Sequence, residues 1–281
     1  MRVAVASDIH VDGYEFWGTY AELLSEEIYD HGAELFVLCG DVTNDIVLFK
    51  HFMSYFCMLL EKQGIELLFV PGNHDVWVTN SKFPLPSSKE KYYQVLPNIF
   101  NKINNAHYLP TKPYVIDDYA FVGNMGWYDY SYSSDNYSRA VLLCKKYLQY
   151  TWLDYKYVHW DGKKDEEILE ELMLIFDEQL ESVKDKNVIA CTHMVPLKKF
   201  CKSKMGEGFD FFTAYMGSEK IFDVIKKYPN IKRALYGHTH YVGNEAHENI
   251  QFINASIGHR FQNKGSTTKA FIRKRLQCFS I

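Results

Sequence analysis

Long uncharged apolar runs are missing from this sequence, although 47% of its 281 residues are hydrophobic. A helix that spans a membrane needs about 20 consecutive apolar residues, and a secretory signal peptide needs a basic start followed by an apolar stretch. Neither pattern is present. No long uncharged apolar run occurs in the sequence, and at its start Met1 and Arg2 lead directly into a short strand-like segment. We therefore expect a soluble intracellular protein, cytoplasmic by default, that does not act on a membrane.

Cysteine is scarce, and positive charge is not in excess. The six cysteines are scattered, which favours free thiols over disulfides. The formal net charge is −4, which argues against a general nucleic-acid-binding protein. Repeats and low-complexity tracts are also missing. The aromatic share is high, at 16%, and we interpret it mainly as core filling.

Four short polar segments stand out because each follows an apolar run typical of a β-strand, and a further histidine, His193, falls between the last two. The segments are Asp8-Ile9-His10, Gly40-Asp41, Gly72-Asn73-His74-Asp75 and Gly237-His238-Thr239-His240. Rigid strand ends can hold metal ligands in a preformed geometry. The pattern therefore indicates a metal site assembled from distant parts of the chain.

The order and spacing of these blocks resemble the calcineurin-like metallophosphoesterase superfamily, whose pattern is D-x-H, G-D, G-N-H-D/E, a single His and G-H-x-H. The blocks span residues 8 to 240. D-x-H alone is a weak signal, but G-N-H-D and G-H-T-H in this order are specific. The resemblance implies an α/β fold built as a four-layer sandwich. Two mixed sheets pack face to face between helices, with a dinuclear metal site at the C-terminal ends of the strands.

Strand-like and helix-like segments along the chain agree with such a fold. Residues 46–63, 166–184 and 219–228 have helical patterns. Strand-like runs lie at Val3–Ser7, Leu35–Cys39, Leu67–Pro71, Tyr114–Ile116, Ala120–Gly123, Val188–Cys191, Arg233–Tyr236, Gln251–Asn254 and around Ala270–Phe279. The alternation of strands and helices in the first part predicts parallel strands with right-handed crossovers. We expect a single domain over residues 1–281, with an insertion or cap at 125–165, where the regular pattern is lost.

The resemblance also implies the metal ligands. One metal is assigned to Asp8, His10, Asp41 and His240. The other is assigned to Asp41, Asn73, His193 and His238, so Asp41 bridges the two. Carboxylate, imidazole and amide ligands suit Mn, Fe or Zn, and the lack of thiolates argues against a structural zinc site.

Two metal ions in such a site can share a hydroxide that attacks phosphorus in line with the leaving oxygen. His74 resembles the catalytic histidine of the superfamily, which protonates the leaving group or stabilises the transition state. We expect Asp75 to orient His74 or raise its pKa.

The substrate is less well defined than the chemistry. After Gly40-Asp41 the chain lacks the Asp-Arg-Gly extension of protein phosphatases, and Asp75 stands where they carry Glu. The acidic-aromatic extension of the DNA-repair nucleases is also absent. The sequence therefore favours a stand-alone phosphohydrolase or phosphodiesterase acting on a small phosphorylated substrate such as a nucleotide. A nuclease for nucleic-acid ends and an inactive scaffold are the alternatives, and no protein partner can be inferred.

Four residues are weaker candidates for substrate binding. Trp127 and Tyr128 follow the Ala120–Gly123 strand and could stack on a base or simply wall the cleft. Lys198 and Lys199 begin a basic loop, with Lys202 and Lys204, that could hold a distal phosphate or only be solvated.

Two further sets of residues receive no functional role from the sequence. Arg273 and Arg275 would share one face of a charged edge strand. The remaining histidines are expected to have no role as ligands, although His159 and His259 lie near plausible site loops.

Overall fold

The computed structural model describes residues 1–79, 86–201, 210–259, 262 and 265–281. Its first sheet has the strand order β13-β1-β2-β3-β4. The bounds are β1 Arg2–Ala6, β2 Leu35–Cys39, β3 Glu66–Val70, β4 Ala106–Tyr108 and β13 Gln277–Ser280. The first four strands are parallel, and β13 is antiparallel to β1. Every residue of β2 is buried, as expected for a strand covered on both faces.

The second sheet has the strand order β11-β12-β10-β9-β6-β5. The bounds are β5 Tyr114–Ile116, β6 Tyr119–Asn124, β9 Asn187–Thr192, β10 Ile231–Tyr236, β11 Val242–His247 and β12 Ile250–Ala255. The four inner strands are parallel, and the edge strands β5 and β11 are antiparallel to their neighbours. Both sheets are therefore mixed, as the resemblance implies.

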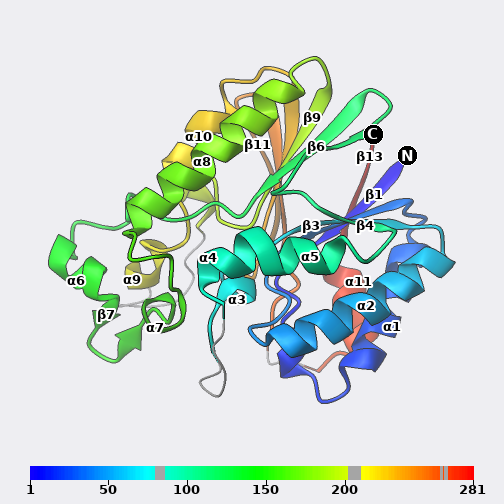
Figure 1. The fold of residues 1–281 in the computed structure, drawn as a ribbon, viewed down its shortest axis with the longest axis horizontal. Coiled ribbons are helices and arrows are strands. Elements are labelled where there is room, and N and C mark those ends of the chain that lie inside the picture. The colour runs from blue at the N-terminus through cyan, green and yellow to red at the C-terminus, as the bar shows by residue number, and fades with distance from the viewer. Residues whose placement is uncertain (80–85, 202–209, 260–261, 263–264) are drawn as a thin grey trace.

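Helices cover the outer face of each sheet (Figure 1). On the first sheet they are α1 Trp17–Asp30, α2 Ile46–Lys62, α5 Leu96–Phe100 and α11 Thr268–Arg275. On the second they are α8 Asp165–Ser182 and α10 Glu219–Ile225. Strand alternation explains the layers, since Val3 and Val5 pack between the sheets while Ala4 and Ala6 face the helices. The predicted four-layer α-β-β-α sandwich is confirmed.

The three helices predicted from their patterns are present with small shifts at the ends. α2 begins after Asp45, whose carboxylate accepts hydrogen bonds from the backbone N–H groups of Val47 and Leu48. The short helical elements are η1 Val11–Gly13, α3 Asn73–Val76, α4 Ser88–Glu90, the π-helical turn η2 Lys91–Val95, η3 Lys198–Phe200 and α9 Asp210–Thr213.

Residues 125–165 lie between β6 and α8 and contain a small hairpin flanked by short helices. Its elements are α6 Arg139–Cys144, β7 Lys146–Tyr147, β8 Tyr150–Thr151 and α7 Asp154–Tyr157. Buried aromatic side chains of this segment, such as Trp127 and Tyr132, belong to the same hydrophobic cluster as the outer helices. The segment lies beside α9, at one end of the sandwich (Figure 1).

The tail differs from its predicted form. Residues 268–275 form α11, and only Gln277–Ser280 form a strand. The hydroxyl of Thr267 accepts from the backbone N–H of Ala270 and caps the helix, while the basic residues of its last turn suit the helix dipole. Arg273 and Arg275 therefore do not lie on a charged edge strand. Among the described residues, no helix is long and apolar enough to cross a membrane.

Candidate metal centre

The polar segments singled out in the sequence meet at one edge of the two sheets. Asp8 and His10 follow β1, Asp41 follows β2, and Asn73 opens α3 after β3. His193 follows β9, and His238 and His240 follow β10 of the other sheet. The sheets are joined at this edge by a backbone hydrogen bond from Ser7 N–H to the Ala255 carbonyl. Strand ends from both sheets thus surround one small volume, as predicted.

Three groups of donor atoms lie within reach of a metal ion, and the smallest comprises His10, His240 and His259. The other two consist of predicted ligands. One comprises Asp8, His10, Asp41 and His240, and the other comprises Asp8, Asp41, His193 and His238. In the first group the Nε2 atoms of His10 and His240 are 3.1 Å apart. In the second, His193 Nε2 lies 3.0 Å from His238 Nδ1 and 3.2 Å from the Asn73 side-chain oxygen. All seven predicted ligands are therefore gathered in one place.

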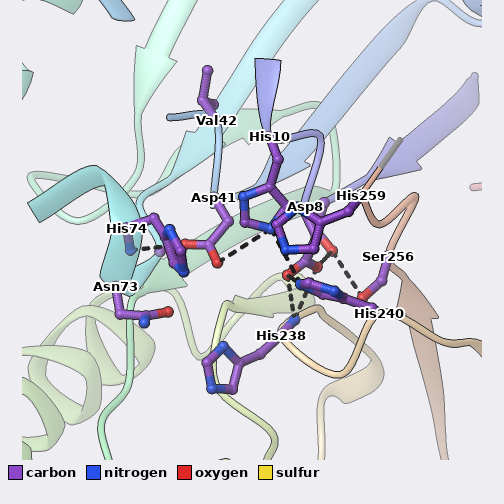
Figure 2. Close-up of polar contacts among 12 residues, drawn as sticks. Asp8, His10, Asp41, Val42, Asn73, His74, His238, His240, Ser256 and His259 are labelled. Carbon is purple, nitrogen blue, oxygen red and sulfur yellow. Dashed lines mark hydrogen bonds and ion pairs between the residues drawn. The ribbon is translucent and has the colours of Figure 1, made fainter. Parts of the chain in front are cut away.

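Asp41 lies between the two groups, with its carboxylate between Asn73 and His74 on one side and His10 on the other (Figure 2). Its Oδ2 is 3.9 Å from His10 Nε2 and 3.4 Å from His193 Nε2. Burial would raise the pKa of Asp41, but the neighbouring histidines His193 and His74 lower it well below the ordinary value. A carboxylate in this position can face two cations at once.

The donors fit metal ions. His193 Nδ1 lies 2.8 Å from the Cys39 carbonyl oxygen, so this nitrogen carries the proton and Nε2 presents a lone pair to the site. Burial lowers the pKa of His193, but Asp41 and Asp8 raise it to about 9. His238 Nε2 is buried with no hydrogen-bond partner among the described residues.

Five of the ligand residues have left-handed backbone conformations. Their φ angles are 54° for Asp8, 39° for His10, 58° for Asp41, 71° for His238 and 56° for His240. Such angles are uncommon outside glycine, and each costs about 1–3 kcal/mol. The sharp turns bend each side chain back from its strand end toward the common centre. The surrounding hydrogen bonds hold them there, such as that from Asp8 N–H to the Gly40 carbonyl.

Glycine is required next to the ligands because the two loops after β2 and β3 touch. A Cβ atom on Gly40 would collide with the backbone of Gly72, and one on Gly72 would collide with the Asp41 carboxylate. Glycine at both positions allows the chain to turn sharply beside the ligands. In the structure, the lack of a side chain on Gly40 and on Gly72 also allows the loop after β2 and the loop after β3 to pack against one another.

His74 lies at the wall of the site and is half-buried. Its backbone N–H donates to Asp41 Oδ1 at 3.0 Å, and its ring stacks on Trp77 at 3.9 Å between centroids. Among the described residues, the Asp75 carboxylate forms no hydrogen bond with this ring, so the expected orienting contact is not seen there. It accepts instead from the backbone N–H groups of Gly72, Asp41, Val42 and Thr43. Asp75 therefore joins the β2 and β3 loops, and burial with the charge of Asp41 raises its pKa to about 7.

A cavity of about 340 Å³ opens over this centre. Asp41, Asn73, His74, His238 and His240 form its polar floor. Its walls are largely apolar and come from the insertion, α9 and the loops after α3 and β10, and include Trp77, Trp152, Leu153, Phe212, Met216 and Tyr241.

The four weaker substrate candidates do not line this cavity. Trp127 and Tyr128 are fully buried, and their polar atoms hydrogen-bond to Asp165 and Asp154. They follow a core strand and fill the core below the insertion. Lys198 donates to the Ser133 carbonyl at the surface, and Lys199 covers the Phe200 ring. Lys202 and Lys204 lie outside the described residues.

Sequence reasoning missed two site residues. His259 was expected to have no role as a ligand, yet its ring stacks on His10 at 4.0 Å between centroids and lines the cavity. Burial and the neighbouring His240 lower its pKa to about 4. Asp154 is buried in the insertion and contacts Asn73. His259 follows the predicted strand that ends at Asn254, which was the one available signal, whereas Asp154 lies in no motif.

Comparison with known proteins agrees with this geometry. The family model described as calcineurin-like phosphoesterase matches residues 1–242. The chain belongs to the calcineurin-like phosphoesterase family. Its members act through a dinuclear metal centre, and the donor groups described above are this chain's candidate ligands for it.

Solved structures share the fold. The chain is similar to a phosphopantetheinyl hydrolase from Mycobacterium tuberculosis, with a TM-score of 0.77, 18% identity, and coverage of 99% of this chain and 95% of that one. It is also similar to a dimetal phosphatase from Danio rerio, with a TM-score of 0.53, 13% identity, and coverage of 90% and 86%. At these identities the likeness concerns the fold alone. No curated protein matches the sequence.

Proposed function

We propose that this phosphoesterase uses two metal ions, held by Asp8, His10, Asp41, Asn73, His193, His238 and His240, to hydrolyse a small phosphodiester. The observation that carries the proposal is the convergence of these oxygen and nitrogen donors on one centre, four of which, Asp41, Asn73, His238 and His240, form the floor of a cavity. Bound metal ions would supply Lewis-acid stabilisation of phosphoryl oxygens and would activate water near neutral pH.

The remaining steps belong to the chain's own side chains. His74 forms part of the cavity floor, and its ring stacks on Trp77. In this position its imidazole can donate a proton to the leaving oxygen of a substrate whose phosphoryl group lies over Asp41. The apolar walls exclude bulk water and so strengthen electrostatic interactions with the phosphoryl group.

The walls favour a diester over a monoester. None of the described lining residues is Lys or Arg, so only the metal centre and the histidines would balance the charge of the substrate. A monoester dianion carries more charge than a diester and no second ester group. A diester has one negative charge and a second arm, for which the cavity offers space beyond the floor. The similar M. tuberculosis hydrolase is named for a phosphopantetheinyl group, which is itself an organic phosphate ester.

A nuclease remains the alternative, and it fits less well. The net charge is −4, and the described cavity lining contains no Lys or Arg that would follow a nucleic-acid backbone. A nuclease predicts activity on oligonucleotides that falls steeply with salt. An inactive scaffold fits less well still, because every ligand position and His74 are retained.

The test compares hydrolysis of bis(4-nitrophenyl) phosphate with that of 4-nitrophenyl phosphate by Mn²⁺-loaded protein. We expect kcat/KM for the diester to exceed that for the monoester. A preference for the monoester would make the protein a phosphatase and overturn the diester assignment. Absence of hydrolysis of both, in protein shown to contain two metal ions, would overturn the proposed function.

A further inference from the structure

We propose that the aromatic walls of the cavity form a subsite for an uncharged, largely apolar arm of the substrate diester. This inference rests on the proposed function and adds the chemistry of the group that does not leave. The subsite is formed by Trp77, Trp152, Phe212 and Met216, which come from segments far apart in the chain.

The subsite is continuous with the metal centre. The Trp77 ring stacks on His74, and the Trp152 ring meets the edge of His238 at 5.6 Å between centroids. The Phe212 ring lies 6.0 Å from Trp152 on the same wall. A phosphoryl group on the floor would therefore place its second ester arm directly between aromatic faces.

The charge of the lining decides the chemistry of the arm. Among the described residues that line the cavity, the titratable side chains are Asp41, four histidines, Cys201 and Tyr241, and none is Lys or Arg. An anionic arm would lose hydration and would find no Lys or Arg among the described lining residues, which is unfavourable in an apolar site. An apolar arm gains about 25 cal/mol for each Å² that it removes from water. The volume of about 340 Å³ is within the range of small-molecule pockets.

The test uses three 4-nitrophenyl phosphodiesters with one leaving group and different second arms: methyl, phenyl and 4-carboxyphenyl. Because the leaving group is constant, differences in kcat/KM report on the arm. We expect the phenyl ester to exceed the methyl ester by about tenfold or more, which corresponds to burial of one small aromatic ring. The carboxyphenyl ester should fall below the phenyl ester.

Variants of the wall residues test whether the preference for the phenyl ester arises from this subsite. Phe212→Ala should reduce the phenyl-to-methyl ratio, whereas Phe279→Ala, which removes another half-buried ring on β13 at the edge of the first sheet, should leave the ratio unchanged. Met216→Ala is the second variant if Phe212→Ala does not fold. Equal kcat/KM values for the three arms, or an unchanged ratio in the folded wall variants, would overturn the subsite. Failure to hydrolyse any of the esters would instead count against the proposed function.

A different observation carries a second inference, that Asp154 is a positioning residue for the metal centre. Its carboxylate is 1% exposed and accepts four hydrogen bonds. The donors are Asn73 Nδ2 at 3.0 Å, Trp77 Nε1 at 2.6 Å, Tyr128 Oη at 3.1 Å and Trp152 Nε1 at 2.8 Å. One buried carboxylate thus fixes the side chain of the predicted ligand Asn73 and the rings of two residues that line the cavity, Trp77 and Trp152.

The bond to Asn73 sets which end of its amide faces the metal centre. With Nδ2 donating to Asp154, the side-chain oxygen points the other way, where it lies 3.2 Å from His193 Nε2. Metal ions bind the amide oxygen and not the amide nitrogen. A carboxylate behind the ligand accepts only from the nitrogen and so excludes the flipped amide.

Asp154→Asn tests this role, because it retains the shape and removes the carboxylate. We expect the affinity for one of the two metal ions to fall about 10- to 100-fold, as measured by calorimetric titration with Mn²⁺. Asp165→Asn is the matched control. Asp165 also accepts from a tryptophan, Trp127, and a tyrosine, Tyr130, in the same part of the molecule, but it lies outside the cavity lining. Its loss should leave both affinities unchanged.

A double-mutant cycle separates positioning from general stability. In the Asn73→Ala background, Asp154→Asn should add little further loss of metal affinity, because the side chain that it orients is gone. Full additivity of the two losses, or an unchanged affinity in folded Asp154→Asn, would overturn the inference. A loss of the same size in Asp165→Asn would show a general effect of the insertion and would overturn it too.

Discussion

His74 differs from the other histidines of the floor because it belongs to none of the candidate ligand groups among the described residues. His74→Asn should keep both metal ions and lower kcat by about 10²- to 10⁴-fold, since it removes a proton donor and no ligand. Metal content by atomic emission and steady-state kinetics on a nitrophenyl diester measure the two effects. Unchanged turnover, or loss of one metal ion, would contradict this role.

Lys91 gives a second prediction at the residue scale. Its ammonium is almost fully buried and donates to the Trp77 carbonyl at 2.6 Å. Burial lowers its pKa from 10.5 to about 8. Between these values the unfolded chain binds more protons than the folded one, so the contribution of Lys91 to stability rises with pH from about 8 to 10.5.

Lys91→Met removes this dependence. Across that range, wild type should gain about 3 kcal/mol of unfolding free energy relative to the variant. Urea unfolding of both proteins at pH 7.5 and 10.5 measures the difference, and other groups that titrate in the range cancel in the comparison. A constant difference between the two proteins would refute it.

At the residue scale, the sequence reveals a site residue only when that residue lies in a recognisable motif. The seven ligands lie in short blocks that keep their order and spacing, so the resemblance located them all. Asp154 could not be found in this way, because its role arises from four hydrogen bonds to residues 73 to 152 that only folding brings together. Trp127 and Tyr128 were misplaced for the opposite reason. They follow a strand near the site, but their side chains point into the core.

At the scale of elements, α11 shows how a local pattern can mislead. Arg273 and Arg275 alternate with Lys274, and the sequence suggested a strand. In the helix, Arg273 forms two hydrogen bonds with the buried carboxylate of Glu27 on α1. The partner of Arg273 lies 246 residues away in the chain, and those of Arg275 lie 18 and 35 residues away. The pattern of the tail alone therefore cannot reveal them.

Arg275 connects α11 to the metal centre and gives the prediction for this element. Its guanidinium donates to the carbonyls of Ile257 and His240, each at 2.6 Å. Arg275→Ala should free the His240 loop and weaken binding of one metal ion by about tenfold or more, as measured by Mn²⁺ titration. Lys274→Ala, an exposed neighbour on the same helix, is the control and should bind both ions normally. Equal affinities in the two variants would disprove the connection.

For the whole molecule, the sequence predicted the inner strands of both sheets and β5, because short apolar runs bounded by polar turns are distinctive. It missed two edge strands, the short β4 and the polar β11. It did not predict how the strands are shared between two sheets, and that arrangement came from the resemblance. The reason is physical, since strands such as β6 and β9 pair across more than 60 residues of intervening chain. Local patterns carry no information on such long-range pairing.

Removal of the metal ions should destabilise the whole molecule without unfolding it. The two sheets share a closed apolar core, formed by residues such as Val37, Phe121 and Ile189, that contains none of the ligands. Mn²⁺ at about 100 times its dissociation constant should add about 2.7 kcal/mol per site and raise the melting temperature by several degrees. EDTA should reverse the shift, as followed by circular dichroism. The double variant His238→Ala/His240→Ala should lose most of it, and a full shift in that variant would contradict the assigned ligands.

The left-handed turns at the ligand positions bear on how a protein of this kind changes over generations. Each of the five residues occupies a conformation that glycine or asparagine adopts more easily. A descendant that no longer needed metal ions would gain stability from such replacements at Asp8, His10, Asp41, His238 or His240. Selection for folding would then favour the loss of ligands instead of merely tolerating it. A lineage without activity should therefore replace these residues early, and the backbone at these five positions is where such a loss would first be seen.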